Sequence, residues 1–248
     1  MRMSGNTILV TGGTSGIGLG LAQRFHAEGN TVIVAGRREE LLASIVTAHP
    51  GMDSVVIDVA DAASIRRGVT TVIGRHPDLD VVINNAGIML AEDLTDPGHL
   101  AVAEQTVTTN LLGPIRLLAE VVPFLAAKPA GVVINVSSGL AFVPLPMTPT
   151  YCAAKAALHS YTESLRAQLA GTGVQVLELI PPGVQTDLMG QAARGQGMPL
   201  KAFPDEVMAI LRTEPTAREI CVKDVLFLRD AEAQGRRDDV LAMLSGAH

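Results

Sequence analysis

Short runs of apolar, mostly β-branched residues recur along the chain, and longer stretches with helical spacing of apolar residues separate them. The runs are apolar throughout rather than at every second position, which is typical of strands buried on both faces of a sheet. They predict strands at Thr7–Thr11, Thr31–Ala35, Ser54–Ile57, Asp80–Ile83, Gly131–Val136, Val174–Ile180 and, as a shorter candidate, Glu219–Val222.

The stretches between these runs predict helices. They lie near Ile17–Glu28, Glu39–Ala48, Ala62–Arg75, His99–Ala127, Ala153–Ala170 and Asp205–Leu211. Strands and helices that alternate on this spacing predict an α/β fold, a doubly wound parallel sheet of about seven strands with helices on both faces. Since no Pro- or Ser-rich linker divides the chain, we expect one domain over residues 1–248, with a flexible glycine-containing loop near 187–203.

Composition narrows the classes of function. The chain has 248 residues, 48% hydrophobic residues, 3% aromatic residues and a net charge of −6, so we expect no nucleic-acid partner. No charge-free apolar run reaches membrane-spanning length, and we expect no membrane association. Cys152 and Cys221 have no metal-ligand spacing, and no metal site is expected. The few cysteines and the absence of a signal-peptide pattern favour a cytoplasmic location.

The first chemical signal is the glycine-rich sequence that joins the first strand to the first helix, Thr11-Gly-Gly-Thr-Ser-Gly-Ile-Gly18. Gly12 permits a tight turn, Gly16 lets the backbone approach a pyrophosphate, and Gly18 permits close contact between helix and strand. The alternative is a plain strand–helix turn. We assign this turn to a dinucleotide, with the candidate binding residues Gly12, Thr14, Ser15, Gly16, Ile17 and Gly18.

The second signal follows the second strand, where folds that prefer NAD carry an acidic residue for the ribose 2′-hydroxyl. Here the strand ends in Gly36-Arg37-Arg38, with no acid. Both arginines are able to bind a 2′-phosphate through charge-assisted hydrogen bonds, which predicts NADP (NADPH) as the cofactor. The alternative is a solvated basic turn that pairs with Glu39 and Glu40.

The third signal is Tyr151-Cys-Ala-Ala-Lys155, in which the spacing i, i+4 places the phenol and the amine on one helix face. A cation beside a phenol favours the phenolate and is expected to lower the pKa of Tyr151. The pair is common by itself. Ser138 strengthens the indication of a functional site, because it follows the strand Gly131–Val136 at the carboxyl edge of the sheet, where ligands bind.

Together with Asn84-Asn-Ala-Gly87 and Asn110, these sequences resemble the short-chain dehydrogenase/reductase family over about residues 5–190, and its DltE-like subgroup in particular. The resemblance implies a Rossmann-like sheet and a catalytic set of Asn110, Ser138, Tyr151 and Lys155. Tyr151 would be the acid/base, Lys155 would bind the nicotinamide ribose, Ser138 would bond the substrate carbonyl, and Asn110 would hold a water in a proton relay.

The resemblance also implies further cofactor contacts. Asp58 and Val59 would face the adenine, and Asn85, Ala86 and Gly87 would line the adenosine ribose. The backbone near Val184 and Thr186 would meet the carboxamide, although Pro182 stands where the family usually has glycine. The glycine-rich turn lacks the basic residue of many NADP users, so the NADP prediction rests on Arg37 and Arg38.

These patterns predict an NADP(H)-dependent oxidoreductase of the carbonyl reductase or alcohol dehydrogenase type, a ketoreductase. The alternatives are a nucleotide-binding sensor or scaffold without catalysis and an epimerase or dehydratase with different glycine spacing.

Apolar residues in the loops that should surround the nicotinamide predict an apolar ketone, aldehyde or alcohol as the substrate; they are Met89, Leu140, Phe142, Val143, Leu145, Met147, Leu188, Met189, Met198, Leu200 and Phe203. Apolar residues on two helices predict a homodimer or homotetramer; they are Leu111, Leu112, Leu117, Leu118, Leu158 and Leu165.

Overall fold

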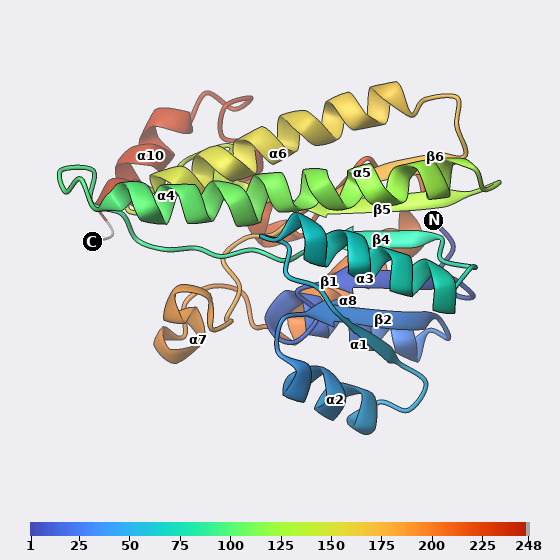
Figure 1. Ribbon diagram of the computed structural model, residues 1–248. Coiled ribbons are helices and arrows are strands. Elements are labelled where there is room, and N and C mark those ends of the chain that lie inside the picture. The colour runs from blue at the N-terminus through green and yellow to red at the C-terminus, as the bar shows by residue number, and fades with distance from the viewer. Residues whose placement is uncertain (247–248) are drawn as a thin grey trace.

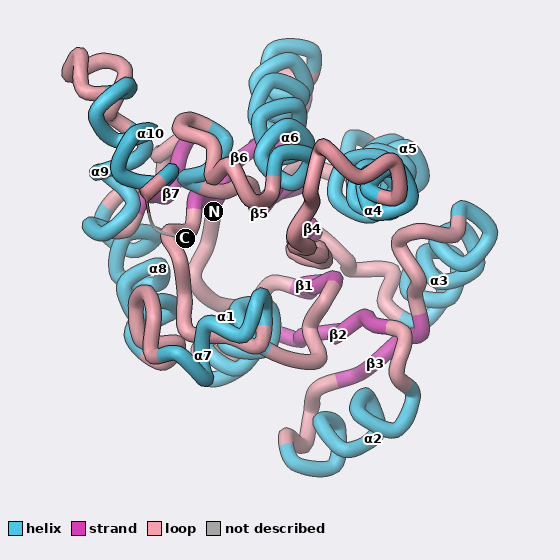
Figure 2. The backbone as a smooth tube through the Cα atoms, turned by 90° about the vertical axis from the view of Figure 1, so that its left-hand side faces the viewer, coloured by secondary structure: helices cyan, strands magenta, loops and turns pink. Residues whose placement is uncertain are grey.

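Seven parallel strands form one sheet in the computed structural model, which describes residues 1–246 of the chain. Their order across the sheet is β3-β2-β1-β4-β5-β6-β7 (Figures 1 and 2). Strands β2 and β3 are added on one side of β1, and the strands from β4 onward are added on its other side. Doubly wound sheets open a crevice for ligands at this position, between β1 and β4. The strands are β1 (Thr7–Thr11), β2 (Thr31–Gly36), β3 (Asp53–Val56), β4 (Val81–Asn84), β5 (Gly131–Val136), β6 (Val174–Ile180) and β7 (Glu219–Cys221).

Helices cover both faces of this sheet, as the sequence predicts (Figure 2). One face carries α1 (Gly16–Ala27), α2 (Glu39–Ala48) and α8 (Ala202–Thr213). The other carries α3 (Ala62–Arg75), α4 (His99–Val107), α5 (Gly113–Ala126) and α6 (Pro149–Gln168). The short helices are α7 (Gln191–Arg194), α9 (Leu226–Arg229) and α10 (Arg237–Ser245).

Alternate residues of β1, β2, β4, β5 and β6 pack into two separate cores. On β1, Ile8 and Val10 pack against α1 and α8, while Leu9 packs against the face covered by α3 and α5. All three are fully buried. This burial on both faces explains why the strands have uninterrupted apolar sequences.

Several helical regions differ from the prediction. The expected helix His99–Ala127 is interrupted by a π-helical turn, Thr108–Leu112, between α4 and α5. Helix α6 begins at Pro149 rather than Ala153, because proline fits the first helical turn, where its missing N–H needs no partner. The C-terminal helices α9 and α10 lie in a region for which the sequence predicted none.

The stretch His99–Ala126 is long and apolar enough to cross a membrane by length and composition alone, with a mean hydropathy of 1.2 over its most apolar window. Its buried side chains, among them Leu117, Leu118 and Val121, pack into the core with the sheet and α3. The core helix of a globular protein meets the same criterion, and 39% of this window is buried.

Candidate active site

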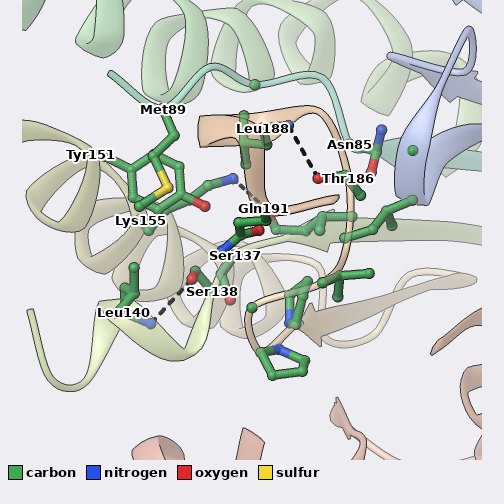
Figure 3. A pocket seen from close by; sticks show the side chains of 18 of the residues that line it. Asn85, Met89, Ser137, Ser138, Leu140, Tyr151, Lys155, Thr186, Leu188 and Gln191 are labelled. Atoms are coloured by element: carbon green, nitrogen blue, oxygen red, sulfur yellow. Dashed lines mark hydrogen bonds between the residues drawn. The ribbon is translucent and has the colours of Figure 1, made fainter. Parts of the chain in front are cut away.

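A cavity of about 430 Å³ opens at the carboxyl ends of β1, β4, β5 and β6 (Figure 3). A second, smaller hollow of about 130 Å³ shares Gly12, Thr14, Ala86 and Gly87 with it. The two together form an elongated cleft at the crevice where the order of the strands reverses. The sequence placed its candidate residues at this edge of the sheet.

The glycine-rich turn forms one wall of the larger cavity. Gly12 and Gly16 have φ angles of 63° and 53°, which favour glycine. A Cβ atom on Gly18 would lie 2.3 Å from the carbonyl oxygen of Gly12, so close packing between helix and turn requires glycine there as well. Within the described chain, the N-terminus of α1 receives no side-chain cap from Ser15, which leaves its first N–H groups suited to phosphate oxygens.

Asn85, which directly follows β4, supports this turn. Its Nδ2 atom donates to the carbonyl oxygens of Thr11 and Gly12 at 3.0 and 3.2 Å. The Thr11 hydroxyl in turn accepts from the backbone N–H groups of Asn85 and Ala86. The Asn85 side chain therefore holds the turn in shape, a role that its predicted place near the adenosine ribose did not include.

The smaller hollow contains the predicted adenine and phosphate residues. Arg37, Arg38, Asp58 and Val59 all line it, together with Gly36. The Arg38 guanidinium donates to Oγ1 of Thr14 at 3.1 Å, which brings the basic turn beside the glycine-rich turn. A cradle of glycines, an uncapped helix end and two adjacent arginines fit a phosphorylated dinucleotide that runs the length of the cleft.

The predicted catalytic side chains meet at the other end of the cleft. Ser138, Tyr151 and Lys155 all line the larger cavity and lie close together in Figure 3. The Nζ atom of Lys155 donates to the carbonyl oxygen of Val136 at 2.7 Å and lies 5.7 Å from the centre of the Tyr151 ring. The Ser138 hydroxyl caps the short turn after β5 by accepting from the N–H of Leu140.

The protonation of Tyr151 differs from the sequence prediction. Burial raises the pKa of Tyr151 to about 12, and the Ser138 hydroxyl acts in the opposite direction without overcoming it. Burial also lowers the pKa of Lys155 to about 8, while the Glu178 carboxylate opposes this shift. The pKa of Tyr151 is therefore raised in this geometry rather than lowered as expected, because burial disfavours the phenolate. The protein presents a protonated phenol at neutral pH.

Asn110 lies in the π-helical turn and is fully buried. Its side chain accepts from the N–H of Ile88 at 2.8 Å and donates to the carbonyl oxygen of Ile88 at 2.7 Å. A Cβ atom on Gly87 would lie 3.1 Å from Oδ1 of Asn110 and 3.8 Å from Nζ of Lys155. Asn110 thus fixes the segment after β4 beside Lys155. Both polar atoms of its side chain are bonded to the backbone of Ile88 in that segment.

The loop after β6 is tied back to the protein. Val184 and Thr186 line the larger cavity, as predicted, and so do Pro181 and Pro182. Met198 donates its N–H to the carbonyl oxygen of Gly183 at 2.8 Å, and the carbonyl oxygen of Met198 accepts from Gln185 at 2.9 Å. These bonds anchor the base of the predicted loop 187–203, within which α7 forms.

The list of apolar residues predicted to line the pocket is correct in part. Of the residues proposed for it, Met89, Leu140, Leu145 and Leu188 line the cavity. Others pack elsewhere: Met198, Leu200 and Phe203 against the core of α1 and α8, Val143 against α10, and Phe142 against His159. No sequence pattern predicts four further residues that line the cavity, Asp187, Gln191, Leu228 and Leu244. Leu228 and Leu244 belong to α9 and α10, and only a correct prediction of these helices could have found them.

The arrangement matches a known family. The model of the short chain dehydrogenases matches residues 6–197 of the chain. The chain belongs to the short-chain dehydrogenase/reductase family. The resemblance stated from the sequence is confirmed, and this dehydrogenase/reductase is an oxidoreductase with a fold that binds a nicotinamide cofactor.

Similar proteins place the dehydrogenase/reductase within this family. It is 39% identical over 207 residues to the uncharacterized oxidoreductase DltE of Bacillus subtilis, covering 83% of this chain and 82% of that protein. A short chain dehydrogenase from Burkholderia cenocepacia, solved in complex with NADP, superposes with a TM-score of 0.83 at 27% identity over 98% of this chain and 99% of that one. A Burkholderia phymatum member, solved in complex with NAD, shares the fold with a TM-score of 0.82 at 19% identity over 94% of this chain and 96% of that one.

Proposed function

We propose that this enzyme uses NADP(H) to interconvert an apolar carbonyl compound and the matching secondary alcohol. The observation that carries the proposal is the convergence of Ser138, Tyr151 and Lys155 beside apolar side chains, at the end of a cleft that begins at two arginines. The cofactor, when bound, supplies or accepts the hydride. The chain's own residues must then hold the carbonyl and manage its proton.

The protonated phenol of Tyr151 suits a proton donor to the carbonyl oxygen during reduction. The Ser138 hydroxyl lines the same cavity and is placed to donate a second hydrogen bond that stabilises negative charge on that oxygen. Lys155, which is buried but lines the cavity, is placed to hold the ribose and to supply a positive charge near the phenol. Met89, Leu140 and Leu188 exclude water from the reacting carbonyl.

The NADP assignment rests on Arg37 and Arg38 in the smaller hollow. The Burkholderia cenocepacia relative supports it, since that protein was solved in complex with NADP. The Burkholderia phymatum structure with NAD shares only the fold at 19% identity, and its cofactor carries no weight for the choice here.

A panel of carbonyl compounds with NADPH tests the proposed substrate class. We expect kcat/KM to rise as an aryl or alkyl ketone lengthens, because each buried methylene contributes about 0.8 kcal/mol. Sugars and keto acids should react poorly, because the apolar side chains Met89, Leu140 and Leu188 leave most of their hydroxyl or carboxylate groups without partners. Higher kcat/KM on sugars or keto acids would contradict the substrate class. Binding of NADPH without turnover of any carbonyl would favour the rival, a silent nucleotide sensor.

We also propose a cytoplasmic homodimer or homotetramer. Of the leucines named for the interface, Leu117, Leu118 and Leu158 are buried in the core and are not available. Leu112, and Leu100 twelve residues before it, are exposed by 36% and 57% on the α4–α5 side and support an interface there. Light scattering at micromolar concentration should report at least a dimer, and Leu100→Glu with Leu112→Glu should shift it toward the monomer. A monomeric wild-type protein would refute this assembly.

A further inference from the structure

A row of polar side chains crosses the sheet beneath the catalytic helix α6. Asn84, Asn135, Glu178 and Glu219 occupy paired positions on β4, β5, β6 and β7. Asn84 donates to Asn135 at 2.8 Å, and Asn135 donates to Thr162 of α6 at 2.9 Å. Buried polar groups are costly unless they are satisfied, so such a row within an apolar sheet points to a function.

Glu178 is the buried charged member of this row. Its side chain is completely inaccessible to solvent. Its Oε2 atom is 2.8 Å from Nδ1 of His159, whereas Oε1 has no hydrogen-bond partner within residues 1–246. A buried carboxylate with one unmatched oxygen is unfavourable by itself and requires positive charge nearby.

The buried Lys155 is near enough for the Glu178 carboxylate to raise its pKa against the effect of burial. His159 lies one helical turn after Lys155 on α6, so both side chains point toward the sheet from the same face. Lys155 donates to the carbonyl of Val136, which pairs with Leu179, the residue after Glu178. We propose that Glu178, held by His159, is a positioning residue that keeps the buried Lys155 ammonium charged and in place for the reaction. This proposal rests on the function proposed above.

The surroundings favour a charge network over a metal site. One ligand atom each from His159, Glu178 and Glu219 lies within 4.8 Å of the others. However, the Glu219 carboxylate already accepts two bonds from Arg229, at 2.7 and 2.9 Å, and this guanidinium would repel a cation. The titratable and charged groups around Glu178 and Lys155 are Tyr151, His159, Glu163 and Arg166 on α6, Glu219 and Cys221 on β7, and Arg229 and Asp230 at the end of α9.

The small number of lysines makes a direct test practical. The chain contains only Lys128, Lys155, Lys201 and Lys223. Lysine labelled with ¹³C at Cε gives four NMR signals, and Lys155→Arg identifies the one from Lys155. Burial lowers the pKa of Lys155 and Glu178 opposes that shift, so Glu178→Gln should lower the Lys155 titration midpoint further. We expect a shift on the order of one pH unit, the lower end for loss of a neighbouring opposite charge.

Glu163→Gln is the matched control, because Glu163 also lies on α6 but its side chain is 60% exposed. It should leave the Lys155 midpoint unchanged, since an exposed charge is screened by solvent. The same midpoint in wild type and Glu178→Gln would overturn the proposal. If the amide variant fails to fold, Glu178→Met removes the charge together with the unpaired oxygen and leaves only Nδ1 of His159 without its partner; the same shift is required of it.

The titration uses the cofactor-free protein and needs no substrate, so its outcome is independent of the proposed reaction. If the enzyme also reduces a carbonyl, Glu178→Gln should move the alkaline limb of its kcat/KM profile to lower pH by a similar amount. A uniform loss of activity with no change in the pH profile would indicate a merely structural role and would contradict the positioning role.

Discussion

Replacing Tyr151 with Phe is expected to reduce kcat for carbonyl reduction by at least about 10²-fold, the lower end for a positioned acid/base group. The substitution removes one oxygen and keeps the ring, which packs with Met89 and Cys152. It also removes the protonated phenol, whose pKa of about 12 keeps its proton available at neutral pH. Steady-state kinetics with NADPH and the best ketone of the panel would measure the loss.

The chain offers a matched control for this experiment, because Tyr161 is its other tyrosine and lies on the same helix. Tyr161 packs at the edge of the α3–α5 core, away from the cavity. Tyr161→Phe should leave kcat near the wild-type value. Near-wild-type turnover by a folded Tyr151→Phe variant would show that another group transfers the proton.

Replacing both Arg37 and Arg38 with Ala is expected to weaken NADPH binding by about 10²-fold and to leave NADH binding nearly unchanged. Each charge-assisted bond to the 2′-phosphate contributes roughly 1.5–3 kcal/mol, or about tenfold or more in affinity. Fluorescence titration of each cofactor against the wild-type and double-variant proteins would measure the effect.

Arg66 and Arg67, an exposed pair on α3, provide the control for loss of two positive charges. Their replacement by Ala should change NADPH affinity little. An acid introduced at Gly36 is a poorer test, because its Cβ would lie 2.8 Å from Cγ2 of Thr14. A wild-type enzyme that is more efficient with NADH than with NADPH would refute the interpretation of the arginine turn.

The strand positions and the meeting of Ser138, Tyr151 and Lys155 at one cavity are predictable from the sequence, because both follow from local patterns. Strands buried on both faces leave continuous apolar runs, and β1, β5 and β6 begin and end at the predicted residues. The carboxyl edge of a parallel sheet brings the residues that follow its strands together, and for this reason Ser138 and the glycine-rich turn line one cavity.

The remaining features depend on tertiary contacts that no local pattern encodes. Phe142 and Phe203 have the same apolar character as Leu140, but packing against His159 and the α1–α8 core removes them from the cavity. The raised pKa of Tyr151 reflects desolvation, which the spacing to Lys155 does not reveal. Glu178 appears in the sequence as one acid within an apolar strand, and its contact with His159 emerges only when α6 packs on β6.

The most direct test of the central claim is transfer of deuterium from the cofactor to a carbonyl carbon. Wild-type protein would be incubated with an aryl ketone and NADPH that carries deuterium at both C4 positions, and the alcohol would be examined by mass spectrometry. A hydride-transferring enzyme with this site should place one deuterium on the carbinol carbon, and the Tyr151→Phe variant should form far less product. Tight binding of NADPH with no deuterated alcohol from any carbonyl in the panel would contradict the proposed function.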